Sequence, residues 1–339
     1  MQAGIRRGTH DIVARTIMLK KLSPCLAALG TIAGPAMAAA PFPAGPITIV
    51  VPNAAGGLAD NIARPLADAL GHELKQPVIV ENKGGAGGVV GTGMVARAKP
   101  DGYTLLLTLS SISGLPEADR LLGRKPAFQL DQFVPIARIT ADPNLLVVRA
   151  DAPWKSVAEL VADAKKNPQA LNYGSSGVYG AMHIPMEMLK AASGAPITHV
   201  PFSGGGPALV SLLAGQVQLA ASGPANASTF VRSGKMRPLA HWGTKPLASM
   251  PDVPSLKSLG YDVEFTQWSA LIAPAATPRP VIDALREAVR KVTAQAELRQ
   301  VFVNLGSPLD YMDAPEFAPY WKADAERVQA AVRRIGKVD

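Results

Sequence analysis

The stretch VPNAAGGLADNIARPLADAL, residues 51–70, indicates the fold class of this 339-residue chain. It continues a β-branched segment, residues 47–51, that is typical of a buried strand, and it ends in an amphipathic helix. Two glycines at 56–57 form the turn between them. Pro65 is tolerated in a first helical turn but would break a helix interior, so the helix should start near Asp60. Such a turn exposes backbone N–H groups at a helix N-terminus, where an anion can bind.

The same strand–glycine turn–helix pattern recurs at residues 171–189 and at residues 198–215. Strands and helices alternate elsewhere too, which predicts α/β domains with largely parallel sheets. The second pattern should start its helix near Gly180, because Pro185 must lie in a first turn. The other expected strands are 78–81, 103–108, 134–139 and 145–149, and the other expected helices are 61–75, 89–98 and 157–166.

The first 40 residues have the pattern of a cleavable signal peptide. Lys20 and Lys21 precede a short apolar stretch, residues 22–33, and an A-x-A site follows at 36–38. Cleavage is expected near residues 39–41. The true start is either Met1 or Met18, and a start at Met18 would give the basic region a normal length. The single cysteine, Cys25, lies inside this segment, where the proline before it argues against a lipoprotein anchor.

The charge of the exported part excludes a nucleic-acid protein. Residues 1–40 hold five basic residues against one acidic residue, so they account for +4 of the net charge of +8. The remainder is only mildly basic and has no Lys/Arg stripe. Hydrophobic residues make up 48% of the chain and charged residues 18%, enough apolar material for a large core. No further stretch is apolar enough to span a membrane, so the sequence predicts an exported soluble protein.

Motifs that would indicate catalysis, a cofactor or a metal are not met. The glycines of residues 84–93 do not fall at the spacing of a dinucleotide fingerprint, and no P-loop occurs. Residues 174–178 lack the second glycine of a nucleophile elbow. The histidines are not paired at metal-ligand spacing, and His183 fits a helix face better than a general base. No cofactor or metal is therefore expected.

Several segments, taken together and in order, resemble the solute receptors of tripartite tricarboxylate transporters, the Bug or TctC family. They cover essentially all of residues 44–335. The matching segments are ITIVVPNAAGGLADNIAR (47–64), PVIVENKGGAGGVVGTGMVARAKPDGYTLLL (77–107), LNYGSSGVYGAMH (171–183), HVPFSGGGPALVSLLAGQVQLA (199–220), MPDVPSLKSLGY (250–261) and WSALIAPAATP (268–278).

The resemblance implies a two-lobed periplasmic-binding-protein fold of the type II kind, with two crossover strands and a cleft between the lobes. The crossings should fall near residues 145–148 and 264–271. Lobe 1 would hold residues 42–143 and 266–339, and lobe 2 residues 144–265. The family implies a periplasmic, monomeric receptor that binds a small carboxylate and passes it to membrane transporter subunits.

The resemblance also implies a ligand site at the glycine turns, with Asp60 capping its helix and ordering the loop. The second-lobe turn departs from the family pattern, because Val178 and Tyr179 replace an asparagine and a glycine. This indicates either an aromatic or less charged ligand, with Tyr179 stacking on it, or a protein that binds weakly and serves another purpose. The retained glycines favour the first interpretation. The predicted ligand-binding residues are Asn53, Ala54, Ala55, Gly56, Gly57, Asp60, Ser110, Ser111, Ser176, Gly177, Val178, Tyr179, Gly180, Ala181, Phe202, Ser203 and Ser222.

Two other functions stay open at this point. A ligand sensor that docks on a membrane signalling protein would have the same cleft. A secreted hydrolase would need a nucleophile, for which Ser111, Ser175 and Ser176 are the candidates.

Overall fold

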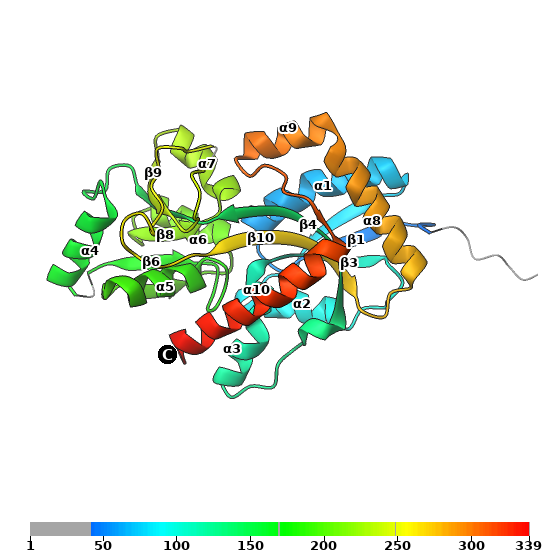
Figure 1. Ribbon diagram of the computed structural model, residues 1–339, viewed down its shortest axis with the longest axis horizontal. Helices are drawn as coiled ribbons and strands as arrows, with labels where there is room; N and C mark the ends of the chain where they lie inside the picture. Colours follow the sequence, from blue (N-terminus) through cyan, green and yellow to red (C-terminus); the bar gives the residue numbers. More distant parts are fainter. Residues whose placement is uncertain (1–41, 169, 248, 339) are drawn as a thin grey trace, which may run out of the picture. The chain divides into compact units, whose positions relative to one another are not determined.

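Two mixed β-sheets organise the chain, and each forms the centre of one lobe (Figure 1). The computed structural model describes residues 42–168, 170–247 and 249–338. The predicted signal peptide, its cleavage site, Met18 and Cys25 lie outside the described residues. The first sheet has the order β11-β4-β10-β3-β1-β2, with β1 Ile47–Val51, β2 Val78–Asn82, β3 Thr104–Leu109, β4 Phe133–Pro143, β10 Thr266–Pro274 and β11 Met312–Asp313. The second has the order β7-β6-β8-β5-β9, with β5 Leu145–Arg149, β6 Asn172–Ser175, β7 Thr198–Pro201, β8 Leu219–Ser222 and β9 Met236–His241.

The expectation of largely parallel sheets was wrong. Strands that alternate with helices are parallel, namely β1 with β2 and β3, and β6 with β7 and β8. The strands that carry the chain between the sheets pair antiparallel, as β10 does with β3 and β4, and β5 does with β8 and β9. A strand that enters a sheet from the neighbouring lobe has no crossover helix to reverse it, so it runs against the local direction.

Helices cover the faces of the sheets. The α-helices are α1 Leu58–Leu74, α2 Val89–Ala96, α3 Leu115–Leu121, α4 Val157–Lys166, α5 His183–Ser193, α6 Gly205–Leu213, α7 Pro224–Arg232, α8 Arg279–Ala294, α9 Ala296–Leu305 and α10 Ala314–Ile335. Short 3₁₀ turns lie at η1 Ala86–Gly88, η2 Ser110–Ser113 and η3 Leu130–Gln132. Ser156 caps the N-terminus of α4, because its hydroxyl accepts the Glu159 N–H.

The chain passes between the lobes at two neighbouring points. β4 ends at Pro143 and β5 starts at Leu145, and β10 begins at Thr266, which pairs with Pro143. Between them the Asn144 amide donates to the Ala181 carbonyl at 2.8 Å. Figure 1 shows β4 and β10 lying side by side across this region. The exact residues at which the lobes divide stay a prediction.

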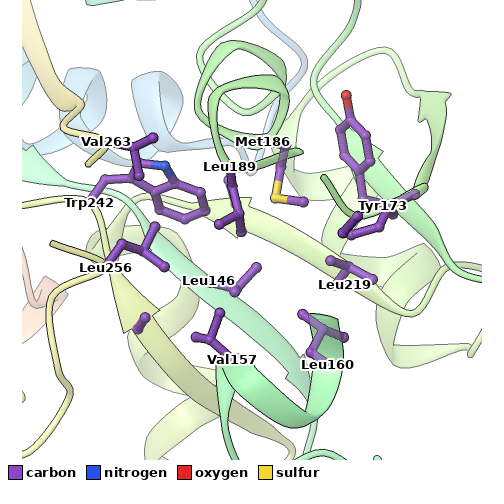
Figure 2. Close-up of a cluster of buried hydrophobic side chains, with 14 of the residues drawn as sticks. Leu146, Val157, Leu160, Tyr173, Met186, Leu189, Leu219, Trp242, Leu256 and Val263 are labelled. Carbon is purple, nitrogen blue, oxygen red and sulfur yellow. The ribbon is translucent and has the colours of Figure 1, made fainter. Parts of the chain in front are cut away.

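Apolar side chains fill both faces of each sheet. One cluster joins α4 and α5 to the second sheet, and Figure 2 shows Leu146, Tyr173, Met186 and Trp242 among its side chains. Val328 and Val332 near the C-terminal end of α10 belong to the same cluster. The start of α10 instead packs on the first lobe through stacked Phe317 and Trp321. The helix therefore joins the cores of both lobes.

Candidate functional site

Hydrogen bonds to Asp60 fix the conformation of the first glycine turn. The Asp60 carboxylate accepts the Gly56 N–H at 2.9 Å, the Arg64 Nε at 3.0 Å and the Asn82 amide at 3.0 Å. Burial alone would raise the pKa of Asp60, but these donors, Arg64 foremost, hold that pKa below its usual value. The residue at the N-cap is Gly57, which has no side-chain cap. Asp60 thus orders the loop as predicted, but the predicted cap of the helix was wrong.

The N-terminal ends of α1, α6 and α7 meet between the lobes. A methyl carbon placed on Gly57 would lie 3.7 Å from the Gly205 nitrogen, and one placed on Gly223 would lie 2.6 Å from Leu58. Gly57 and Gly223 are the N-caps of α1 and α7, and Gly205 begins α6. First-turn N–H groups have no partner inside their own helix, and the helix dipoles add positive potential. Three helix N-termini at one point therefore favour the binding of an anion.

A small inner cavity lies at this point and has a volume of about 20 Å³. None of the described residues that line it is charged. Gln267 is 3% exposed, and its Oε1 has no hydrogen-bond partner in the described structure. A rotation of the amide exchanges its oxygen and nitrogen, so Gln267 can offer a donor or an acceptor. The inner cavity is lined by Asn53, Gly57, Leu58, Ala59, Leu109, Ser176, Met182, Gly205, Ser222, Gly223, Asn226 and Gln267.

A larger outer cavity of about 290 Å³ lies beside the second-lobe turn. Ser176 lines both cavities. The outer cavity is lined from the first lobe by Ala86, Gly87, Val89, Leu115, Ala118, Asp119, Leu122 and Arg124, and from the second lobe by residues 176–179 and 201–203.

Backbone contacts between glycine turns bring the two lobes together around these cavities. A methyl on Gly204 would lie 2.9 Å from the Ala54 Cβ, and one on Gly206 would lie 3.1 Å from the Gly56 carbonyl oxygen. Beside the outer cavity, a methyl group added to Gly87 would lie 2.6 Å from the Val178 carbonyl oxygen. Only glycine permits such close approach, which explains the glycine-rich turns in both lobes.

The structure brings most of the predicted residues to this interface but divides them into groups. Asn53, Gly57, Ser176 and Ser222 line the inner cavity, and Gly177, Val178, Tyr179, Phe202 and Ser203 line the outer one. Ala54, Ala55 and Gly56 form the contact with the α6 turn instead.

The remaining predicted residues line neither cavity. The Asp60 carboxylate accepts a hydrogen bond from its own loop, and Ser110 and Ser111 are buried in η2. Gly180 and Ala181 lie in the turn before α5, which begins at His183 and not near Gly180. The helix was predicted to start too early, because the loop that follows the glycine turn continues through residues 180–182 before α5 begins.

Sequence reasoning missed Asn226 and Gln267, the polar residues that complete the inner cavity. Asn226 is in the first turn of α7, and Gln267 is in β10 where the chain returns to the first lobe. The segment Gly223-Pro224, a glycine followed by a proline at the start of a helix, was a signal for the α7 end. No local pattern marks Gln267, because it reaches the site through the pairing of β10 with β4.

Tyr179 does not present its ring for stacking on a ligand. It is 1% exposed, and its hydroxyl donates to the Gly336 carbonyl at 2.7 Å and accepts the Val338 N–H at 3.2 Å. The ring meets His183 edge to face. Its backbone has a φ of +55°, a conformation that costs energy for a residue with a side chain. Tyr179 therefore ties the second-lobe turn to the segment after α10, in contrast to the predicted role.

A pair of histidines, His183 buried and His199 half-buried, supports the same turn. The Ser175 Oγ lies 2.6 Å from the His199 Nε2 and also accepts the Gly177 N–H, and the His183 Nδ1 accepts the Tyr179 N–H. Burial lowers the pKa of His183 to about 3 and of His199 to about 4, so both are neutral at pH 7. Ser175 has no exposed surface. The Ser175–His199 contact, which the sequence did not reveal, thus holds the turn and offers no route for a substrate.

The comparisons with known proteins agree with this geometry. Residues 62–337 match the family model described as tripartite tricarboxylate transporter family receptor. The chain belongs to this receptor family. It is 35% identical over 316 residues to the UPF0065 protein in the gbd 5′ region of Cupriavidus necator, covering 93% of this chain and 95% of that protein.

Solved structures of similar proteins share the fold of the receptor. The periplasmic binding protein BugD is 31% identical with a TM-score of 0.81, covering 87% of this chain and 98% of that one. MatC from Rhodopseudomonas palustris with bound malate is 31% identical with a TM-score of 0.81, covering 86% of this chain and 100% of that one. The two-lobed fold and the family predicted from the sequence are thereby confirmed.

Residues 42–168, 170–247 and 249–338 contain neither a metal-binding cluster nor a membrane-spanning helix. Histidine, cysteine and acidic side chains form no group there that could hold a metal ion. The helices in this part of the receptor are each too short or too polar to cross a bilayer.

Proposed function

We propose that the receptor binds a small carboxylate in the inner cavity and delivers it to the membrane components of a tripartite tricarboxylate-type transporter. The observation that carries this proposal is the meeting of three helix N-termini at a cavity lined by uncharged residues. The N–H groups and helix dipoles neutralise an anion there without a cationic side chain. The malate bound to MatC, a relative with the same fold, supports the same class of ligand.

Binding must include a hinge movement of the lobes. An inner cavity of about 20 Å³ accommodates roughly one water molecule. A carboxylate therefore enters while the lobes are apart, and the glycine turns then close over it. Because N–H groups from both lobes contribute, a bound anion favours the closed state.

A binding screen tests the proposal. Purified protein, refolded to remove bound ligand, is heated with a panel of mono-, di- and tricarboxylates, and hits are measured by calorimetry. A ligand at 100 times its dissociation constant adds about 2.7 kcal/mol of stability. Asn226→Asp should abolish binding, because it puts a carboxylate into the inner cavity. Asn304→Asp on exposed α9 adds the same charge elsewhere and should bind normally. A panel with no hit, or equal binding by both variants, would refute the proposal.

Export and delivery need separate tests. N-terminal sequencing of the protein from a periplasmic fraction should begin near residue 39–41. Deleting the gene should abolish uptake of the identified carboxylate, and light scattering of the purified protein should give a monomer mass. Turnover of generic esters by the pure protein would argue for the hydrolase alternative.

A further inference from the structure

We propose that the outer cavity holds the apolar body of the ligand whose carboxylate binds in the inner cavity. The ligand class is then a monocarboxylate that carries an aromatic or branched apolar group. This inference rests on the proposed function, because it assumes the carboxylate position.

The two cavities are adjacent compartments of one interlobe space. Ser176, 8% exposed, lines both of them. The backbone of Gly87 in the first lobe approaches Gly177 and Val178 in the second lobe closely, and all three residues line the outer cavity. That contact forms only when the lobes close, so it separates when they open. A ligand bound at the open stage can therefore extend past Ser176 into the outer cavity before the lobes close.

The volumes divide the ligand into a small head and a larger body. The inner cavity, at about 20 Å³, has room for roughly one water molecule, so even when the lobes move apart to admit a carboxylate it takes only the anionic head. The outer cavity has about 290 Å³. An apolar cavity of about 150 Å³ is enough to bind benzene. A phenyl-sized body thus fits the outer cavity and does not fit the inner one.

The chemistry of the outer cavity favours an uncharged body. Val89, Leu115, Leu122 and Val178 supply apolar side chains from both lobes. The two charged residues in its lining, Asp119 and Arg124, pair with each other at 3.5 Å. Since their charges cancel, a second carboxylate finds no net positive charge there. Apolar surface removed from water is then the main source of affinity in this compartment.

The experiment compares carboxylates that differ only in the body. Dissociation constants are measured by calorimetry for propanoate, 3-phenylpropanoate and malate. Burying the phenyl group should make 3-phenylpropanoate bind about 10- to 100-fold more tightly than propanoate. Malate should bind more weakly than 3-phenylpropanoate, because its second carboxylate would lie among apolar side chains.

Two neighbouring valines provide a matched pair of variants. Val89 starts α2 and lines the outer cavity, whereas Val90 is 55% exposed and does not line it. Val89→Asp should remove the advantage of 3-phenylpropanoate over propanoate. Val90→Asp adds the same charge to the same helix turn and should behave as wild type. Leu122→Asp, on the α3 side of the cavity, should repeat the effect of Val89→Asp if that variant folds poorly.

The outcomes separate the two proposals. Equal binding of propanoate and 3-phenylpropanoate, tighter binding of malate, or equal effects of Val89→Asp and Val90→Asp would overturn the role of the outer cavity and leave the carboxylate receptor intact. Absence of binding by every carboxylate would overturn both.

Discussion

Gly204→Ala should open the cleft of the receptor without disturbing either lobe. Gly204 has extended backbone angles, φ 172° and ψ 174°, which alanine adopts freely. The added methyl would lie 2.9 Å from the Ala54 Cβ, about 0.5 Å inside the 3.4 Å at which ordinary contacts begin. Ala54 belongs to the opposite lobe, so the lobes can relieve the contact by moving apart. The substitution thus acts on the closed state.

The expected magnitude follows from overpacking. Inserting one methyl into a tight contact costs about 1–3 kcal/mol. If only the closed state binds tightly, this cost reappears in the apparent dissociation constant as about a 5- to 150-fold increase. Calorimetry with the carboxylate that gives the largest thermal shift measures the change, and small-angle X-ray scattering measures the accompanying rise in the radius of gyration of the bound form.

Two controls distinguish closure from folding. Gly45→Ala puts a methyl into open space and should change nothing. Gly204 is also the N-cap of α6, and a weaker cap would lower the urea midpoint of the free protein. An unchanged dissociation constant for Gly204→Ala, or a loss of affinity matched by an equal loss of stability in the free protein, would refute the closure argument.

Three further substitutions test the supports of the turns. Tyr179→Phe should lower the free energy of unfolding by about 1 kcal/mol, because the Gly336 carbonyl loses its donor; urea denaturation measures this, and no change would contradict the tie. Asp60→Asn should cost about 1–2 kcal/mol at pH 7, and because the native pKa is lowered, the cost should shrink as the pH falls through that pKa. His183 and His199 have lowered native pKa values of about 3 and about 4, so the unfolded state takes up their protons first and stability should fall between pH 6.5 and pH 4. His199→Gln should flatten that part of the stability profile, and an unchanged slope in urea midpoints would show that the pair does not titrate in this way.

Local sequence was a good guide to the elements that carry the site. β1, β5 and α4 have the predicted bounds, because residue periodicity is a property of neighbouring residues. The argument that placed Pro65 in a first helical turn was wrong, since α1 begins at Leu58 and Pro65 lies in its interior. The helix that follows the second glycine turn was predicted about one turn too early. Nothing in the local sequence shows whether the turn ends before residue 180 or continues through residues 180–182.

What the sequence by itself determined is the receptor family, the two-lobed α/β fold and the glycine turns that approach each other. These follow from short motifs, whose glycines record close backbone contact even though the partner is unseen. The tertiary structure alone decided which turn residues face a cavity, that Gln267 and Asn226 complete the inner one, and that Tyr179 is turned away toward Gly336. These contacts join residues far apart in the chain, and their partners are chosen by how strands pair and helices pack. No local pattern contains that information.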